Sequence, residues 1–119
     1  MPSAVHPAPR PNGQGILATC YARPIDPSFS TQHALALLEQ FYADEPFIVI
    51  DETSPSTKAT LGANTVHITA RVDERTGWLL IISALDNLVK GASGAAIQCA
   101  NIALGLDETS GLPTSGLMP

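Results

Sequence analysis

The chain has 119 residues, of which 45% are hydrophobic and 14% are charged, a composition typical of one small globular domain or a piece of a larger one. Its net charge of −5, without a run of Lys or Arg, argues against binding to nucleic acid or to an anionic membrane, and no stretch is long and apolar enough to cross a bilayer. The two cysteines are too few for a disulfide-dense secreted scaffold, and no signal peptide is recognisable, so we expect a cytosolic protein. The high apolar content predicts that some surface faces a partner domain or subunit.

The first part of the chain, residues 1–14, is rich in proline and is predicted to form an irregular N-terminal arm, because proline lacks the N–H that regular structure needs. His6 lies in this arm with no partner nearby in the sequence, so a solvated histidine is a simpler interpretation than a catalytic one. Residues 16–23 then alternate as in a strand, and Pro24 ends it.

A helix is predicted from Ser30, a favourable N-cap residue, to Glu45, because Pro46 prevents further extension. His33, in its first turn, is interpreted as a solvated surface residue. Residues 47–50 are strong strand formers and predict a short buried strand. Helical spacing places four side chains toward the core: Leu35, Leu38, Phe41 and Tyr42.

Residues 55–64 are predicted to form a loop that begins Pro55-Ser56-Thr57-Lys58. These residues place two hydroxyls and an ammonium group close together, and such a group can hold a carboxylate or a phosphate through charge-assisted hydrogen bonds. A solvated loop without a ligand explains the same residues. The pattern by itself leaves both interpretations open.

Two strands joined by a tight turn are predicted next. Residues 66–72 alternate and predict a half-buried strand, with His67 on its more polar face. Residues 78–85 are a near-continuous apolar run and predict a buried strand. Gly77 ends a turn of hairpin length between them, so the two strands are expected to pair antiparallel.

The stretch after these strands changes to small residues, 91–96, and then to a helix that Gly105 closes. Apart from a narrow polar stripe of Gln98 and Asn101, this helix is apolar around its circumference, so it is predicted to pack against protein on several sides. Residues 107–119 lack apolar periodicity and are predicted to form an ordered turn followed by a frayed tail.

Gly91 and Gly94 stand at the entry of the last helix. They leave the N–H groups of its first turn sterically open to a phosphate, a carboxylate or another backbone. The alternative is that the residues here are small because a sheet or a second domain lies against the helix. No Cys/His spacing in the chain predicts a metal site.

Residues 83–106, SALDNLVKGASGAAIQCANIALGL, closely resemble the C-terminal signature of N-acetyl-γ-glutamyl-phosphate reductases, S-x-x-DNLVKGA-x-G-x-A-x-Q-x-x-N with a Leu-Gly-Leu ending. Residues 15–19, 55–58 and 72–77 are similar to the family's RGILAT segment, PSTK loop and hairpin, in the same order. The resemblance covers roughly residues 15–111. The predicted elements indicate an α+β fold with a mixed or antiparallel sheet, a hairpin and two main helices. The resemblance implies that this is the dimerisation and substrate domain of a semialdehyde dehydrogenase-like enzyme.

This resemblance divides the chain into an arm (1–14), the dimerisation and substrate domain (15–106) and a tail (107–119). The family's dinucleotide-binding domain, catalytic-cysteine segment and His-Arg-His-type segment have no counterpart here, and Gln14 stands where an arginine is expected. We therefore expect the terminal part of such an enzyme, from a truncated gene, a late start codon or an excision. Without a nucleotide domain its last helix would be exposed, so the isolated chain is expected to be marginally stable or to self-associate.

The implied reaction belongs to arginine biosynthesis. A cysteine attacks the acyl phosphate of N-acetyl-γ-glutamyl phosphate, phosphate leaves, and hydride from NADPH reduces the thioester to the semialdehyde. Cys20 and Cys99 match no catalytic motif of the family, so no catalytic residue is assigned to this chain. The resemblance assigns binding residues to two sides: Asn87, Gly91 and Ala92 to the nicotinamide side of NADP, and Ser56 and Lys58 to the substrate.

Two further interpretations stay open. The chain can be a non-catalytic fragment that dimerises or binds a full-length reductase. It can also be kin to aspartate-semialdehyde dehydrogenases, which share the DN-Leu-x-(Lys/Arg)-Gly-Ala theme but not this form of the PSTK loop. A neighbouring reading frame encoding the first two thirds of the enzyme would favour half of a split reductase.

Overall fold

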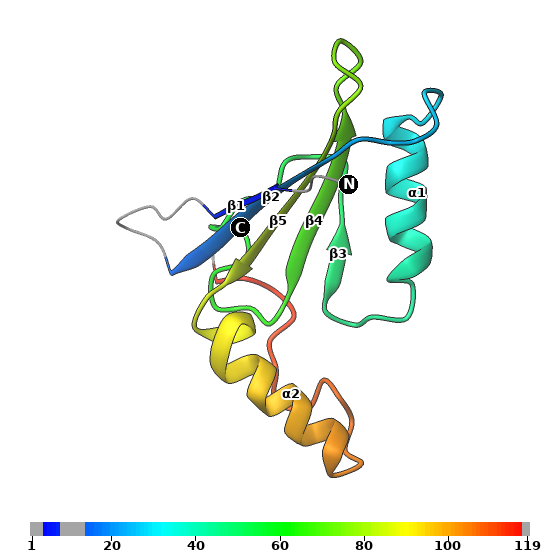
Figure 1. Ribbon diagram of the computed structural model, residues 1–119. Coiled ribbons are helices and arrows are strands. Elements are labelled where there is room, and N and C mark those ends of the chain that lie inside the picture. The colour runs from blue at the N-terminus through cyan, green and yellow to red at the C-terminus, as the bar shows by residue number, and fades with distance from the viewer. Residues whose placement is uncertain (1–3, 8–13, 118–119) are drawn as a thin grey trace.

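A computed structural model of the protein describes residues 4–7 and 14–117 and shows an α+β fold built on a five-stranded mixed sheet (Figure 1). This confirms the predicted fold class. In the sheet the strands follow the order β1-β2-β5-β4-β3. The elements are β1 (Ala4–Pro7), β2 (Gly15–Ala22), α1 (Thr31–Phe41), β3 (Ile48–Ile50), β4 (Val66–Val72), β5 (Leu79–Asp86), a π-helical turn η1 (Val89–Ser93) and α2 (Gly94–Ala103).

The predicted hairpin forms the middle of the sheet. Strands β4 and β5 pair antiparallel from Val66↔Leu85 to Val72↔Leu79, and β2 pairs antiparallel with the other edge of β5. Gly77 takes a positive φ of 73° and donates its N–H to the Asp73 carbonyl at 2.7 Å, as the last residue of a tight turn does. Strand β3 is parallel to β4, so the chain between them crosses over one face of the sheet.

The N-terminal arm is less irregular than predicted, because Ala4–Pro7 form β1 and pair antiparallel with β2. A proline is tolerated here because β1 is an edge strand and Pro7 is its last residue. Residues 1–3 and 8–13 lie outside the described residues, as does the side chain of His6.

Helix α1 begins as predicted but ends at Phe41, before the expected Glu45. The Ser30 hydroxyl accepts the His33 N–H at 3.3 Å, and His33 Nδ1 accepts the Ser30 N–H at 3.3 Å. His33 is therefore part of a helix cap as well as a surface residue. Phe41 was predicted to face the core, but it is 78% exposed and packs edge-on against Tyr42 at 4.9 Å between ring centroids. Phe41 lies in the final turn of α1, beyond the part of the helix where Leu35 packs on the sheet.

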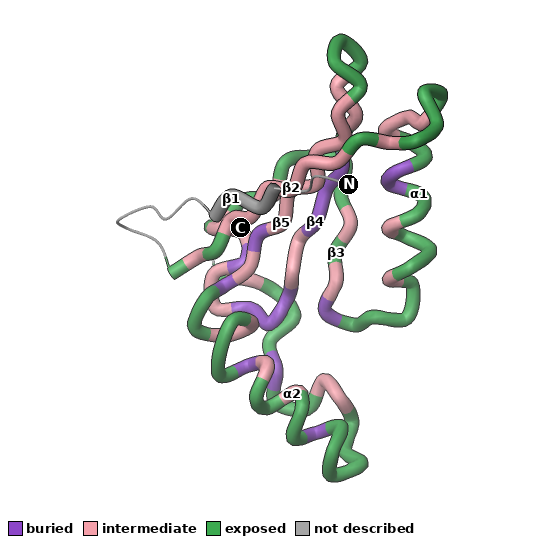
Figure 2. The backbone as a smooth tube through the Cα atoms, in the orientation of Figure 1, coloured by how far each residue is buried: buried purple, intermediate pink, exposed green. Residues whose placement is uncertain are grey.

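The core lies on both faces of the sheet. On one face, Ala34 and Leu35 of α1 pack with Ala70 of β4 and are buried (Figure 2). On the other face, the crossover between β3 and β4 runs behind the sheet, where Thr69 and Ala84 are buried. Strand β5 was predicted to be buried, but most of it is only half-buried.

Helix α2 leaves the sheet at the end of β5 and projects away from it (Figure 1). Only Gly94 and Asn101 of α2 are buried. Within the described residues the helix therefore does not pack on several sides, and it is exposed as expected when no nucleotide domain lies beside it. The segment after it, residues 107–117, is not frayed as predicted. It runs back beside α2 to the sheet, with Leu112 buried, and we call it the C-terminal strap.

Candidate functional site

The two groups of residues assigned to substrate and cofactor lie at the same end of the sheet, where β5 ends and β2 begins. Gly15 pairs with Asp86 across the sheet. The N–H of Asn87 donates to the Gln14 carbonyl at 2.6 Å. A Cβ added to Gly15 would lie 2.3 Å from Cβ of Thr57, so only glycine lets the loop approach this closely. The 55–64 loop therefore contacts Gly15, and the turn after β5 contacts Gln14, the residue before it.

Asp86 joins these two segments directly. Its side chain is 1% exposed, Oδ2 accepts the Gly62 N–H at 2.8 Å, and Oδ1 accepts those of Leu88 at 2.7 Å and Val89 at 2.9 Å. Burial by itself would raise the pKa of Asp86, but the three backbone N–H groups outweigh it and hold the pKa below the ordinary 3.8. A fixed carboxylate thus connects the loop to the start of the last helical segment.

The sequence interpretation did not assign a role to Asp86. The sequence did contain a signal for this role, an aspartate directly before a helical segment, because a carboxylate there commonly accepts the unpaired first N–H groups of the helix. This also changes the reading of the helix entry, because Asp86 already occupies the N–H groups of Leu88 and Val89. Those two groups are therefore not open to a phosphate.

Gly94 is small for a packing reason, although its neighbours are the 55–64 loop and the preceding turn and not a sheet or a second domain. A Cβ there would lie 2.2 Å from Oδ1 of Asn64 and 2.8 Å from the Val89 carbonyl oxygen. Gly91 and Ala92, by contrast, are exposed, as is Asn87. These last three positions remain accessible to a ligand or to another protein segment.

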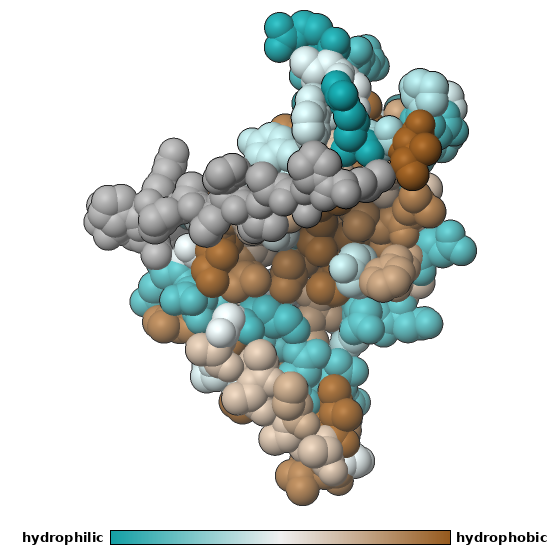
Figure 3. Space-filling view, viewed as in Figure 1, coloured by the Kyte–Doolittle hydropathy of each residue, from teal (hydrophilic) through white to brown (hydrophobic). Residues whose placement is uncertain are grey.

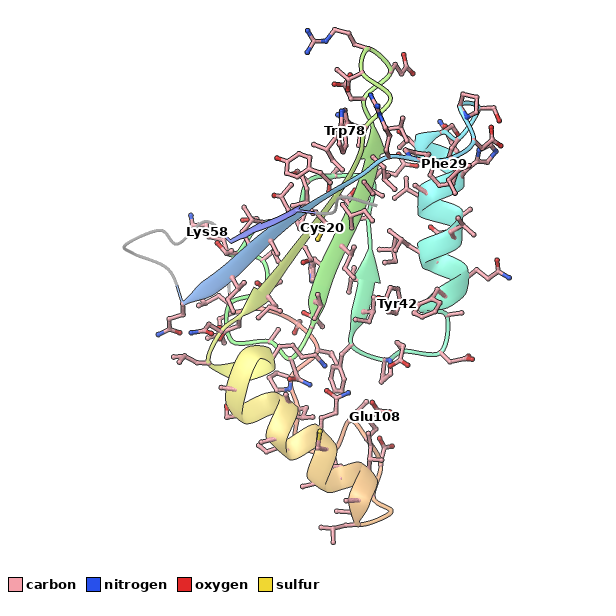
Figure 4. All side chains as sticks on the ribbon, viewed as in Figure 1. Cys20, Phe29, Tyr42, Lys58, Trp78 and Glu108 are labelled. Carbon is pink, nitrogen blue, oxygen red and sulfur yellow. The ribbon has the colours of Figure 1, made fainter. Side chains whose placement is uncertain are left out.

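Ser56 and Lys58 are both exposed at the tip of the loop. The Ser56 hydroxyl accepts the Lys58 N–H at 3.2 Å, and its carbonyl accepts the Ala59 N–H at 3.1 Å, so the two side chains project from one tight turn. Lys58 lies at the margin of the molecule, away from the labelled Glu108 (Figure 4). Its assignment to an anionic substrate stays a prediction.

Lys90, the lysine of the DNLVKGA motif, is engaged within the fold. Its Nζ donates to Oε1 of Gln98 at 2.6 Å and lies 5.1 Å from the ring centroid of Phe47. Burial lowers the pKa of Lys90, and the nearby Glu108 carboxylate opposes this shift. Gln98 also accepts from Asn64 Nδ2 at 3.1 Å. This network was not foreseen from the sequence, because its members come from four separate segments.

The cysteines occupy unrelated positions. Cys20 is half-buried in β2, opposite Ile81, and Cys99 is exposed on α2. Within residues 4–7 and 14–117, His, Cys, Asp and Glu nowhere gather in a group of three or more that could hold a metal ion. In the same part of the chain, no helix has the length and apolar character that a membrane crossing requires.

Residues 3–87 match the family model described as "Semialdehyde dehydrogenase, dimerisation domain", and the chain therefore belongs to this family. Among curated relatives, it is 46% identical to the N-acetyl-gamma-glutamyl-phosphate reductase of Saccharopolyspora erythraea, over 95% of the chain and 33% of that relative. It is 47% identical to the enzyme of the same name from Streptomyces clavuligerus, over 94% of the chain and 33% of the relative. It is 49% identical to the enzyme of the same name from Acidothermus cellulolyticus, over 94% of the chain and 32% of the relative. The chain thus spans about a third of the length of these relatives, and the family resemblance is confirmed.

Proposed function

We propose that this chain is the C-terminal, dimerisation and substrate-side portion of an N-acetyl-γ-glutamyl-phosphate reductase. It would act with a dinucleotide-binding portion in the NADPH-dependent reduction of N-acetyl-γ-glutamyl phosphate to the semialdehyde, with release of phosphate, in cytosolic arginine biosynthesis. The observation that carries the proposal is 46% identity to a reductase of that name over 95% of the chain. The meeting of the 55–64 loop with the turn after β5 supports it.

The loop is suited to an anionic substrate group. Lys58 supplies an ammonium charge and Ser56 a hydroxyl, both exposed and both on one turn. Hydrogen bonds from such groups to a phosphate are stronger than neutral ones and stabilise the charge that a leaving phosphate carries. We therefore assign Ser56 and Lys58 to the phosphate or carboxylate of the substrate.

The turn after β5 is suited to one end of a cofactor. Asn87, Gly91 and Ala92 are exposed, and the small size of Gly91 and Ala92 leaves the backbone accessible. When bound, NADPH supplies the hydride; this chain's part is to contact its nicotinamide side. Because Asp86 connects this turn to the loop, the two binding groups would be held in a fixed relation to each other. The nucleophilic thiolate and the acid–base histidine come from the other portion.

Two apolar surfaces are suited to partners. A groove of about 300 Å³ between α1 and the sheet is lined in part by Leu37, Phe41 and Leu79, and we assign it to self-association of this dimerisation domain. Apolar surface also extends along α2 (Figure 3), where Ile97 and Ile102 are exposed. We assign this second surface to contact with the dinucleotide-binding portion.

The test is complementation. The chain would be assayed for NADP-dependent oxidation of N-acetylglutamate semialdehyde with phosphate, alone and mixed with a separately expressed N-terminal portion of the Streptomyces clavuligerus relative. We expect activity only in the mixture. In that mixture Lys58→Met should raise the KM for phosphate about tenfold, the loss of one charge-assisted hydrogen bond. Arg75→Met, which removes an exposed positive charge on the β4–β5 turn, is the matched control and should leave the KM unchanged.

Inactivity of a mixture in which both parts are folded and bound to each other would contradict the reductase proposal. It would favour the second candidate, a non-catalytic fragment that dimerises or binds a reductase. The exposed apolar surfaces of α1 and α2 are the observation that favours this candidate.

A further inference from the structure

The C-terminal strap is attached to α2 by the polar side chains of that helix. Nδ2 of Asn101 donates to the Glu108 carbonyl at 3.2 Å and to the Ser110 carbonyl at 3.0 Å. Nε2 of Gln98 donates to Oε1 of Glu108 at 2.7 Å. Asn101 is 7% exposed, so its hydrogen bonds are shielded from water. The narrow polar stripe of α2 therefore holds the strap and leaves the apolar faces outward.

The other end of the strap is attached to the loop that presents Ser56 and Lys58. The Asn64 N–H donates to the Pro113 carbonyl at 2.8 Å, and the Leu117 N–H donates to the Leu61 carbonyl at 2.8 Å. Between these bonds the strap backbone lies against the loop, since a Cβ on Gly116 would be 2.2 Å from the Ala59 carbonyl oxygen. The strap thus contacts the loop along residues 59–64.

We infer that the strap positions the substrate loop, and that Asn101 is the positioning residue that fixes the strap to α2. This inference rests on the proposed function, because that function gives Ser56 and Lys58 their role. Both side chains are exposed, and Thr57 between them lies against Gly15, so their placement depends on this contact and on what holds residues 59–64. The strap supplies two backbone hydrogen bonds to that segment, and Asp86 supplies a third through Gly62. A change in the position of α2 is thereby coupled to the loop.

Amide hydrogen exchange of the whole chain tests the coupling without any activity. Asn101→Leu removes the donor to the strap, while Ala100→Leu introduces the same side chain at the neighbouring exposed position of α2 and serves as the control. We expect the amides of Asn64 and Leu117 to exchange at least about tenfold faster in Asn101→Leu, with the β4–β5 ladder unchanged. Unchanged loop amides would overturn the inference. Equally faster exchange in the ladder would also overturn it, because Asn101 would then only contribute to global stability.

The complementation mixture tests the consequence for binding. Asn101→Leu is expected to raise the KM for phosphate severalfold with a smaller change in kcat, since the loop is displaced but its side chains are intact. Leu112→Ala, which weakens the strap at its buried residue, is a second variant with the same expectation should Asn101→Leu not fold. A kcat and KM that are unchanged in an active mixture would overturn the inference. A mixture already inactive with the unmodified chain would contradict the proposed function instead, and the exchange result would still decide the role of the strap.

Discussion

The region formed by the sheet and α1 is stabilised by different forces from the region formed by α2 and the strap. In the first region, apolar side chains of α1 are buried against β4 and β5, with Leu35 at the centre. In the second region, α2 buries only Gly94 and Asn101, and its contacts are hydrogen bonds from named side chains to the strap. The boundary coincides with residue 87, where the match to the dimerisation-domain family ends.

The difference shows that an apolar composition does not by itself say what a helix packs against. Helix α1 turns Ala34 and Leu35 inward onto its own sheet, while Leu37 and Phe41 stay exposed. Helix α2 uses its few polar residues for its own domain and exposes apolar ones, with Ile102 58% exposed (Figure 3). Exposed apolar side chains contribute little to the stability of the isolated chain, but they stabilise an association when a partner covers them.

The largest expected effect is in the first region. Leu35→Ala should lower the free energy of unfolding by about 3 kcal/mol, because it removes buried methyl groups and leaves a cavity in the core. Gln40→Ala, at an exposed polar position of the same helix, is the control and should change the stability little. Urea unfolding followed by circular dichroism measures both. Equal losses in the two variants would show that α1 does not pack as described.

The next effect is at the junction of the two regions. Asp86→Asn should lower the free energy of unfolding by about 2 kcal/mol, since an amide cannot accept all three N–H groups. The folded-state pKa of Asp86 lies below the unfolded value, so its contribution is fully present above about pH 4 and is lost as the pH falls through the folded pKa.

Unfolding measured from pH 7 to pH 2 should therefore be less pH-dependent at its acidic end in Asp86→Asn than in the unmodified chain. The control is Asp107→Asn, at an exposed carboxylate whose pKa is lowered mainly by the Thr109 hydroxyl. This control should unfold like the unmodified chain at neutral pH. An Asp86→Asn variant as stable as the control would contradict the junction role of Asp86.

The smallest effect on stability is expected in the second region. Ile102→Ser should change the free energy of unfolding by less than about 0.5 kcal/mol, because this side chain is already in contact with solvent. It should, however, weaken binding to the dinucleotide-binding portion, which titration calorimetry of the complementation mixture measures. A large loss of stability in the isolated chain would erase the distinction between the two regions.

The centre of the sheet was predictable because its signals are local. Alternation over residues 66–72, the apolar run of β5 and a glycine ending the turn are sufficient to place the central hairpin. The end of α1 was not predictable from the sequence, because Pro46 sets only an outer limit to the helix. The helix ends earlier, at Phe41, where the chain turns toward β3. Phe41 fits the helical periodicity of a core residue, yet its burial depends on where the sheet ends beneath α1.

The candidate site was predictable only in part. The motifs containing Lys58 and Asn87 could be found in the sequence, but their meeting at Gln14 and Gly15 follows from strand order. The role of Asn101 was hidden for a related reason, because its partners are backbone carbonyls, which every residue has.

The sequence by itself therefore determined the family, the hairpin, the cap of α1 and the identity of the residues assigned to binding. The tertiary structure decided which way α2 faces, why Gly94 is glycine, and that residues 107–117 form a strap along α2. The physical reason is the separation along the sequence of the residues that interact. Periodicity and capping act between residues a few positions apart, whereas a carboxylate such as Asp86 connects segments that are adjacent only after the sheet has formed.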